Sequence, residues 1–176
     1  MRRWLIPVLL GLGIALASYQ VTLLAAPYAL MHAAMKKIGG RSAENEFAFG
    51  QMATASNQPI VRPSPDLSYS TCIFDVSKGP VLVDVAAVPG HYWSVSIFDA
   101  RTDAVAVRSD RDTGDKPAKL ALMRPGQKPP GGYEPVLLRH DRGIVLIRIL
   151  LGNPEEFGAI DRIRRKSTCR SAETAN

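Results

Sequence analysis

The sequence predicts a mainly β protein, in which an N-terminal transmembrane helix precedes an antiparallel β sandwich or barrel-like domain with one C-terminal helix. The 176-residue chain begins with an uncharged apolar stretch from Trp4 to Met35. From Tyr69 onward, short runs of alternating apolar and polar residues are separated by Gly/Pro turns, which is typical of such β domains. With 46% hydrophobic and 22% charged residues, bulk disorder, a coiled coil and a multi-span transporter are excluded.

Residues 1–35 are expected to form a membrane anchor. Leu5–Ala26 holds 22 residues without a charge, and about 20 helical residues cross the hydrocarbon core of a bilayer. A cleaved signal peptide is the alternative, because Arg2 and Arg3 precede an apolar stretch and Ala15-Leu16-Ala17 fits a cleavage site,. The apolar run continues past that site, which favours the uncleaved anchor.

Residues 36–66 are expected to form a linker, because turn chemistry dominates at Asn57-Gln58-Pro59 and Pro63-Ser64-Pro65-Asp66,. A short helix around Ala43–Met52, capped by Ser42, is the one regular element expected there. The basic residues Lys36, Lys37 and Arg41 lie after the apolar stretch and Arg2 and Arg3 before it. Charge therefore leaves the orientation of the anchor open.

Residues 67–170 are expected to form the β domain. Alternating patterns place strands at Tyr69–Val76, Val81–Val85, His91–Phe98, Ala104–Arg108, Ala118–Met123, Glu134–Arg139 and Ile144–Leu151. Trp93, Val95 and Ile97 share one face, which predicts a strand whose tryptophan side meets the core. Ile144–Leu151 is almost wholly apolar, so we expect a central strand covered on both faces.

One helix is expected over residues 154–166 of this domain, followed by a tail at 171–176. Asn153 can cap the helix and Pro154 suits its first position. Glu155 and Glu156 complement the positive start of the helix dipole. The basic run Arg162–Arg170 lacks the interleaved aromatic residues of a nucleic-acid surface,, so we expect no nucleic-acid partner.

The two cysteines, Cys72 and Cys169, allow one pairing. We expect a disulfide, because the N-terminal segment directs export and disulfides persist in oxidising compartments. Two unrelated buried thiols are the alternative. The bond would close a loop of about a hundred residues, for which the chain-entropy account predicts a stabilisation of about 4–5 kcal/mol.

No motif in the sequence indicates a catalytic reaction. The sequence lacks a nucleophile elbow, a phosphate-binding loop, a dinucleotide fingerprint and the spacing of metal ligands,. The run Asp110–Asp115 departs from a calcium loop at its glycine and at the twelfth position,. We therefore expect no metal and no cofactor.

The most site-like group lies in the proline-stiffened segment 62–69. Arg62, Asp66 and Tyr69, together with Asp99, are the expected ligand-binding residues. A rigid lead into the first strand, with Asp66 bonding backbone N–H groups, is the structural alternative. For an enzyme, Asp66, Tyr69, His91 and Asp99 would be the candidates, since Asp and His can act as acid and base.

Three segments resemble the family catalogued as domain of unknown function 1254: Arg62-Pro-Ser-Pro-Asp66-Leu-Ser-Tyr69, Phe74-Asp-Val-Ser-Lys-Gly-Pro80-Val and Tyr92-Trp-Ser-Val-Ser-Ile-Phe-Asp99. They occur in order within residues 59–151. The resemblance implies a β-rich domain that is exported in short, membrane-anchored members. Longer members add a second β domain, domain of unknown function 1214, which in short members is often a separate partner protein. Ser64 stands where many long members carry asparagine, so the resemblance does not extend the activity of long members to this chain.

These observations predict a non-catalytic binding or assembly module of the cell envelope. We expect a single-pass anchor in the bacterial inner membrane with the β domain in the periplasm. The expected partners are the membrane and a domain of unknown function 1214-type or other envelope protein. A hydrolase-like envelope enzyme and a purely structural support for another membrane protein are the alternatives.

Overall fold

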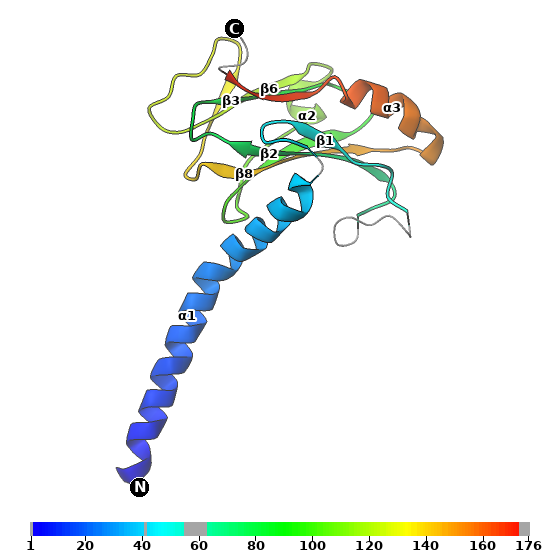
Figure 1. Ribbon diagram of the computed structural model, residues 1–176. Coiled ribbons are helices and arrows are strands. Elements are labelled where there is room, and N and C mark those ends of the chain that lie inside the picture. Colours follow the sequence, from blue (N-terminus) through cyan, green and yellow to red (C-terminus); the bar gives the residue numbers. More distant parts are fainter. Residues whose placement is uncertain (1, 41, 55–62, 173–176) are drawn as a thin grey trace.

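A long helix, α1 (Arg2–Gly39), projects from one side of two stacked β-sheets (Figure 1). The computed structural model describes residues 2–40, 42–54 and 63–172. The segment Trp4–Gly39 is long and apolar enough to cross a membrane, as an anchor or as a signal sequence. Its large apolar side chains between Trp4 and Leu24 are exposed, which suits a helix that faces lipid.

The first sheet is antiparallel throughout and has five strands. Their spatial order is β1 (Phe47–Phe49), β2 (Leu67–Asp75), β8 (Arg142–Leu150), β4 (Trp93–Asp99) and β5 (Ala104–Ser109). The second sheet has four strands, in the order β7 (Glu134–Leu137), β6 (Ala118–Met123), β3 (Val81–Val85) and β9 (Thr168–Ser171). Its β6–β7 pair is parallel, whereas the other two pairs are antiparallel.

The predicted fold class is confirmed: an apolar helix precedes two β-sheets and a short C-terminal helix. Each of the seven expected strands is present, two of them with the expected bounds. A 3₁₀ turn (Pro154–Glu156) and α3 (Phe157–Arg164) occupy the expected helix, and the Asn153 side chain accepts a hydrogen bond from the Glu156 N–H at 3.1 Å. A further short helix, α2 (Asp110–Thr113), follows β5.

One expectation for the chain between these elements is wrong. The short helix around Ala43–Met52 is instead strand β1, because Phe47 pairs with Cys72 and is buried in the core. There a strand-to-strand pairing overrides the local sequence preference. After α3, where no regular element was expected, β9 pairs with β3 and completes the second sheet.

The hydrophobic core lies between the sheets. We call the face of the five-stranded sheet that meets the core its inner face, and the opposite one its outer face. Trp93, Val95 and Ile97 of β4 lie on the inner face with at most 1% exposure, as the alternation predicted. Gly143 lies on the same face of β8, where a Cβ atom would come within 2.1 Å of the Phe98 carbonyl oxygen and 2.6 Å of the Phe74 ring.

A disulfide joins Cys72 of β2 to Cys169 of β9, so the expected pairing is confirmed. Because the two strands belong to different sheets, the bond links the layers of the domain directly. Both cysteines are buried in the main core.

A buried arginine fixes α3 against the edge of the five-stranded sheet. Arg164 is 1% exposed and donates to the carbonyl oxygens of Tyr69 (2.6 Å) and Gly50 (2.5 Å) and to Asp161 Oδ1 (2.8 Å). Burial lowers the pKa of Arg164. Burial alone would raise the pKa of Asp161, but hydrogen bonds from Arg165 and Arg164 outweigh it and lower that pKa. The buried charge is thus fully partnered, as a stable interior arginine requires.

We expect the double variant Cys72→Ala/Cys169→Ala to lose about 4–5 kcal/mol of unfolding free energy, because it frees a loop that spans a sequence separation of 97 residues,. Urea unfolding of the full chain in detergent, followed by tryptophan fluorescence, measures this loss. A variant as stable as the oxidised wild type would contradict the expectation.

We expect Gly143→Ala to lower the unfolding free energy by at least about 2 kcal/mol, because the added methyl group overlaps backbone and a buried ring,. Gly158→Ala is the matched control: nothing lies within 4 Å of that Cβ position on α3, so its stability should stay the same or rise by up to about 1 kcal/mol. The same unfolding assay compares the two, and equal effects would refute the steric argument.

Candidate functional site

The C-terminal part of α1 packs on the outer face of the five-stranded sheet (Figure 1). Met31 and Ile38 of the helix form a second apolar cluster with Ile73 of β2 and Ile144 of β8, and all four side chains are 4–7% exposed. Ile73 and Ile144 are direct register partners. Helix α1 and the β domain therefore meet through a buried apolar contact.

Beside this contact, toward β4, three polar side chains form a hydrogen-bonded chain. Asp99 Oδ2 lies 2.9 Å from His140 Nδ1, and His140 Nε2 lies 3.1 Å from the Tyr28 hydroxyl. The two rings meet edge to face at 5.7 Å, and the Arg101 guanidinium lies over the Tyr28 ring at 5.9 Å. These contacts connect α1 to the ends of β4 and of the β7–β8 loop.

Asp99 has both oxygens occupied. Its Oδ1 accepts hydrogen bonds from the backbone N–H groups of Arg101 (2.8 Å) and Asp103 (3.1 Å), and the residue is 2% exposed. The carboxylate therefore holds the β4–β5 turn and orients His140 at the same time. Because Tyr28 belongs to α1 and His140 to the loop before β8, the hydrogen-bonded chain attaches the helix to the β domain.

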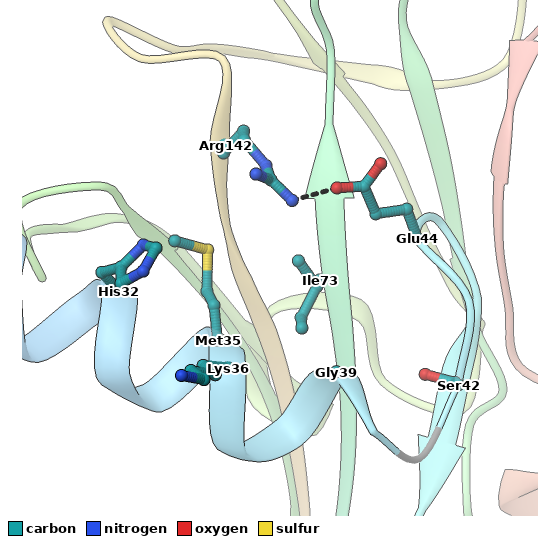
Figure 2. Close-up of a pocket in the computed structure, with 8 residues that line it drawn as sticks. All are labelled: His32, Met35, Lys36, Gly39, Ser42, Glu44, Ile73 and Arg142. Carbon is teal, nitrogen blue, oxygen red and sulfur yellow. Dashed lines mark hydrogen bonds and ion pairs between the residues drawn. The ribbon is translucent and has the colours of Figure 1, made fainter.

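On the other side of the apolar contact, toward β2, lies a pocket of about 420 Å³. Figure 2 shows His32, Met35 and Lys36 reaching it from α1, with Ile73 behind them. Gly39, Ser42, Glu44 and Arg142 complete its lining. The pocket exists because α1 ends at Gly39 and the chain turns back to form β1.

The pocket has more basic than acidic groups. Arg142 forms an ion pair with Glu44, and its Nε lies 3.5 Å from Asp75 Oδ2. Burial alone would raise the pKa of Asp75, but hydrogen bonds from Ser77 and the charge of Arg142 outweigh it and lower that pKa. Within the described part of the chain, the side chains of Lys36 and His32 form no hydrogen bond or ion pair, so Lys36 adds a positive charge to the lining.

The residues expected to form a site do not gather in one place. Tyr69 pairs in register with Arg148 and Asp99 with Gly143, so about 17 Å of strand separates Tyr69 from Asp99. The Tyr69 hydroxyl accepts a hydrogen bond from the Ser64 N–H at 2.9 Å. The Asp66 N–H donates to Ser64 Oγ at 3.3 Å. Arg62 lies outside the described residues.

His91 has a different partner from the expected ones, because its Nδ1 lies 3.8 Å from Glu156 Oε2. The pocket between α1 and the sheet is lined by none of the four residues Asp66, Tyr69, His91 and Asp99. The sequence analysis did not find Tyr28, Lys36, His140 and Arg142 as a group. The pairing of β4 with β8 brings the end of β4 beside the start of β8. A sequence-based prediction of this pairing was the one signal available for part of the group.

We expect Tyr28→Phe to loosen the end of α1, because it removes the hydroxyl that reaches His140 and keeps the aromatic ring. A hydrogen bond contributes about 1 kcal/mol, so backbone hydrogen exchange in residues 31–39 should accelerate about fivefold. Exchange mass spectrometry on the full chain in detergent measures this. Tyr19→Phe, an exposed tyrosine of the same helix, is the control, and equal exchange in both variants would refute this attachment.

Comparison with solved structures finds the same fold in one longer protein. The VPA0106 protein from Vibrio parahaemolyticus is 18% identical with a TM-score of 0.66, over 85% of this chain and 35% of that one. An uncharacterised protein from Burkholderia cenocepacia is 15% identical with a TM-score of 0.47, over 72% of this chain and 34% of that one. The chain thus spans about a third of the length of either protein. No curated protein matches it.

The sequence profile described as "Protein of unknown function (DUF1254)" matches residues 44–171. This range begins before β1 and ends with β9, so it includes both strands that the sequence analysis missed. The match covers most of the chain and contains the three motifs that carry the resemblance. The chain belongs to the DUF1254 family of proteins of unknown function.

Proposed function

We propose that this protein is a non-catalytic binding or assembly module of the bacterial cell envelope, held at the inner membrane by α1 with its β domain in the periplasm. The observation that carries this proposal is the division of the sheet's outer face. The end near Ile73 and Ile144 is covered by the anchor helix. The opposite end carries exposed apolar side chains.

That end carries Tyr92 and Leu150, which are 40% and 44% exposed. The Leu150 N–H donates to the Tyr92 carbonyl oxygen at 2.8 Å, which places the two residues side by side. Val107, which is 47% exposed, lies nearer the middle of the same face, because it pairs with Ser96 and Ser96 pairs with Leu146. Exposed apolar side chains that lie side by side on a sheet face are typical of a surface that another protein covers.

The location outside the cytoplasm is supported by the Cys72–Cys169 disulfide, because such bonds persist in oxidising compartments,. The anchor is supported by the apolar run, which continues past the possible cleavage site Ala15-Leu16-Ala17 as far as Ala26,. The partner that we propose is a separate envelope protein of the domain of unknown function 1214 type, as the family resemblance implies. The length of the solved VPA0106 protein is compatible with such a further domain.

The alternative of a hydrolase-like enzyme at Asp66, Tyr69, His91 and Asp99 receives less support. Acid–base catalysis needs groups within hydrogen-bond reach of one substrate. Tyr69 and Asp99 lie toward opposite ends of the sheet, and the hydroxyl of Tyr69 and both oxygens of Asp99 bind groups of the domain itself.

We expect Leu150→Asp to reduce the recovery of a stoichiometric partner from detergent extracts at least about tenfold, as for a charge buried in an interface centre. Leu137→Asp is the control, because Leu137 is 62% exposed on the other sheet. Both variants should remain in the membrane fraction, with the β domain digested by protease added to spheroplasts. Equal recovery with both variants would contradict the assembly surface, and a protected β domain would contradict the periplasmic location.

A further inference from the structure

If α1 is the anchor proposed above, the length of its apolar stretch sets the depth of each helical residue in the bilayer. Leu5–Ala26 has 22 residues, which is about 33 Å of helix. The hydrocarbon core of a bilayer is about 30 Å thick. Ala26 therefore lies at the end of the core, and Tyr28 lies about 3 Å further along the helix axis, within the headgroup layer.

The aromatic residues at the two ends of this stretch support the same placement. Tryptophan and tyrosine are enriched at both interfaces of a membrane, where their rings lie at the headgroup level. Trp4 and Tyr28 are 24 positions apart, which is about 36 Å of helix, so the two rings flank a hydrocarbon core of about 30 Å. Both side chains are exposed, by 75% and 44%, and so are accessible to headgroups.

The β domain contacts α1 at this same depth. Within the described part of the chain, Tyr28 is the most N-terminal helical residue with a hydrogen bond or ring contact to the β domain, and its partners are His140 and Arg101. The blue, N-terminal part of α1 stands clear of both sheets (Figure 1). Charged groups such as Arg101 and Asp99 are excluded from hydrocarbon. The β4–β5 turn and the β7–β8 loop therefore lie at the headgroup layer.

The Arg101 guanidinium has no protein acceptor in the described part of the chain. It lies over the Tyr28 ring at 5.9 Å, and its Nε is buried without a hydrogen bond. Buried polar groups are nearly always hydrogen-bonded. A guanidinium has five N–H donors, whose arrangement matches the oxygens of a phosphate. An arginine without a protein acceptor at this depth favours a lipid phosphate as the acceptor.

We propose that the β domain rests on the periplasmic leaflet, with the β4–β5 turn and the β7–β8 loop among the headgroups and Arg101 donating to a phospholipid phosphate. The proposal rests on the anchoring of α1 and adds a second membrane contact, made by the β domain itself. Tyr28 joins the two contacts, because it touches both loops where the helix leaves the membrane. Tyr92 and Leu150, at the other end of the sheet, stay free for a protein partner.

Fluorescence quenching in the reconstituted full chain tests the depth of the β4–β5 turn. Both native cysteines are in the disulfide, so a single introduced cysteine carries the fluorophore. Asp103→Cys places it on the exposed turn, and Arg111→Cys places it on exposed α2, at the opposite end of β5. The vesicles contain a phospholipid with a nitroxide on its headgroup, which quenches nearby fluorophores.

We expect loss of fluorescence with Asp103→Cys and none with Arg111→Cys, because the turn lies among the headgroups and α2 does not. Equal quenching of both labels, or quenching of neither, would overturn the proposed contact.

Lipid binding tests Arg101 as the phosphate donor. Native mass spectrometry counts the phosphatidylglycerol bound to the detergent-solubilised full chain. We expect Arg101→Gln to weaken this binding about fivefold, as for the loss of one cation near a membrane surface, and Arg111→Gln to leave it unchanged. Diacylglycerol, which lacks the phosphate, should bind the wild type more weakly. Equal effects of the two variants, or equal binding of the two lipids, would overturn the role of Arg101.

Flotation of the vesicles separates these results from the anchoring itself. A chain without an anchor stays in the soluble fraction, which would contradict the proposed function. A chain that floats with the vesicles while the label of Asp103→Cys stays bright retains the anchor, and this outcome refutes the surface contact alone.

Discussion

The apolar contact between α1 and the outer face of the five-stranded sheet is the interaction on which the junction depends. Met31, Ile38, Ile73 and Ile144 are nearly inaccessible to solvent. Burial of an aliphatic side chain of this size contributes about 1.5–3 kcal/mol, so the four together exceed any single hydrogen bond at the junction. Without this contact, the two isoleucines would face water in the middle of a sheet.

Hydrophobic burial is non-directional, so the apolar contact alone does not fix the orientation of α1 on the sheet. The polar groups beside the contact do so. On the β4 side, Asp99, His140 and Tyr28 fix one edge of the helix through hydrogen bonds. On the β2 side, the pocket leaves the other edge open and lined by Lys36 and Arg142.

Much of the β domain could be predicted because its strands alternate clearly. The run Ile144–Leu151 predicted a central strand covered on both faces, and β8 is central in the first sheet. Its outer face is covered near Ile144, whereas Leu150 at the other end is 44% exposed. What covers the outer face could not be predicted, because the cover is α1, which lies more than a hundred positions away in the sequence. The short strands β1 and β9 also escaped prediction, since three or four residues carry too little periodicity to outweigh local helix or loop signals.

The candidate site was less predictable than the fold for the same reason. Asp99 was singled out from a motif, but its partner His140 follows from the register of β4 and β8, and its further partner Tyr28 from the docking of α1. No spacing in the sequence relates these three residues. Cys72 and Cys169 were the exception, because two cysteines leave one pairing and no register is needed to find it.

The side chains that carry the family resemblance engage groups that shape the fold. Asp99 closes the β4–β5 turn, where Thr102 adopts a positive φ of 66°, and Tyr69 binds the Ser64 N–H and so fixes the segment that leads into β2. Unbound backbone donors at such places would cost about 1–3 kcal/mol each once buried, so these motifs are explained by folding alone. Outside these motifs, the helix–sheet junction is held by contacts between distant parts of the chain, namely Tyr28 with His140 and Arg142 with Glu44.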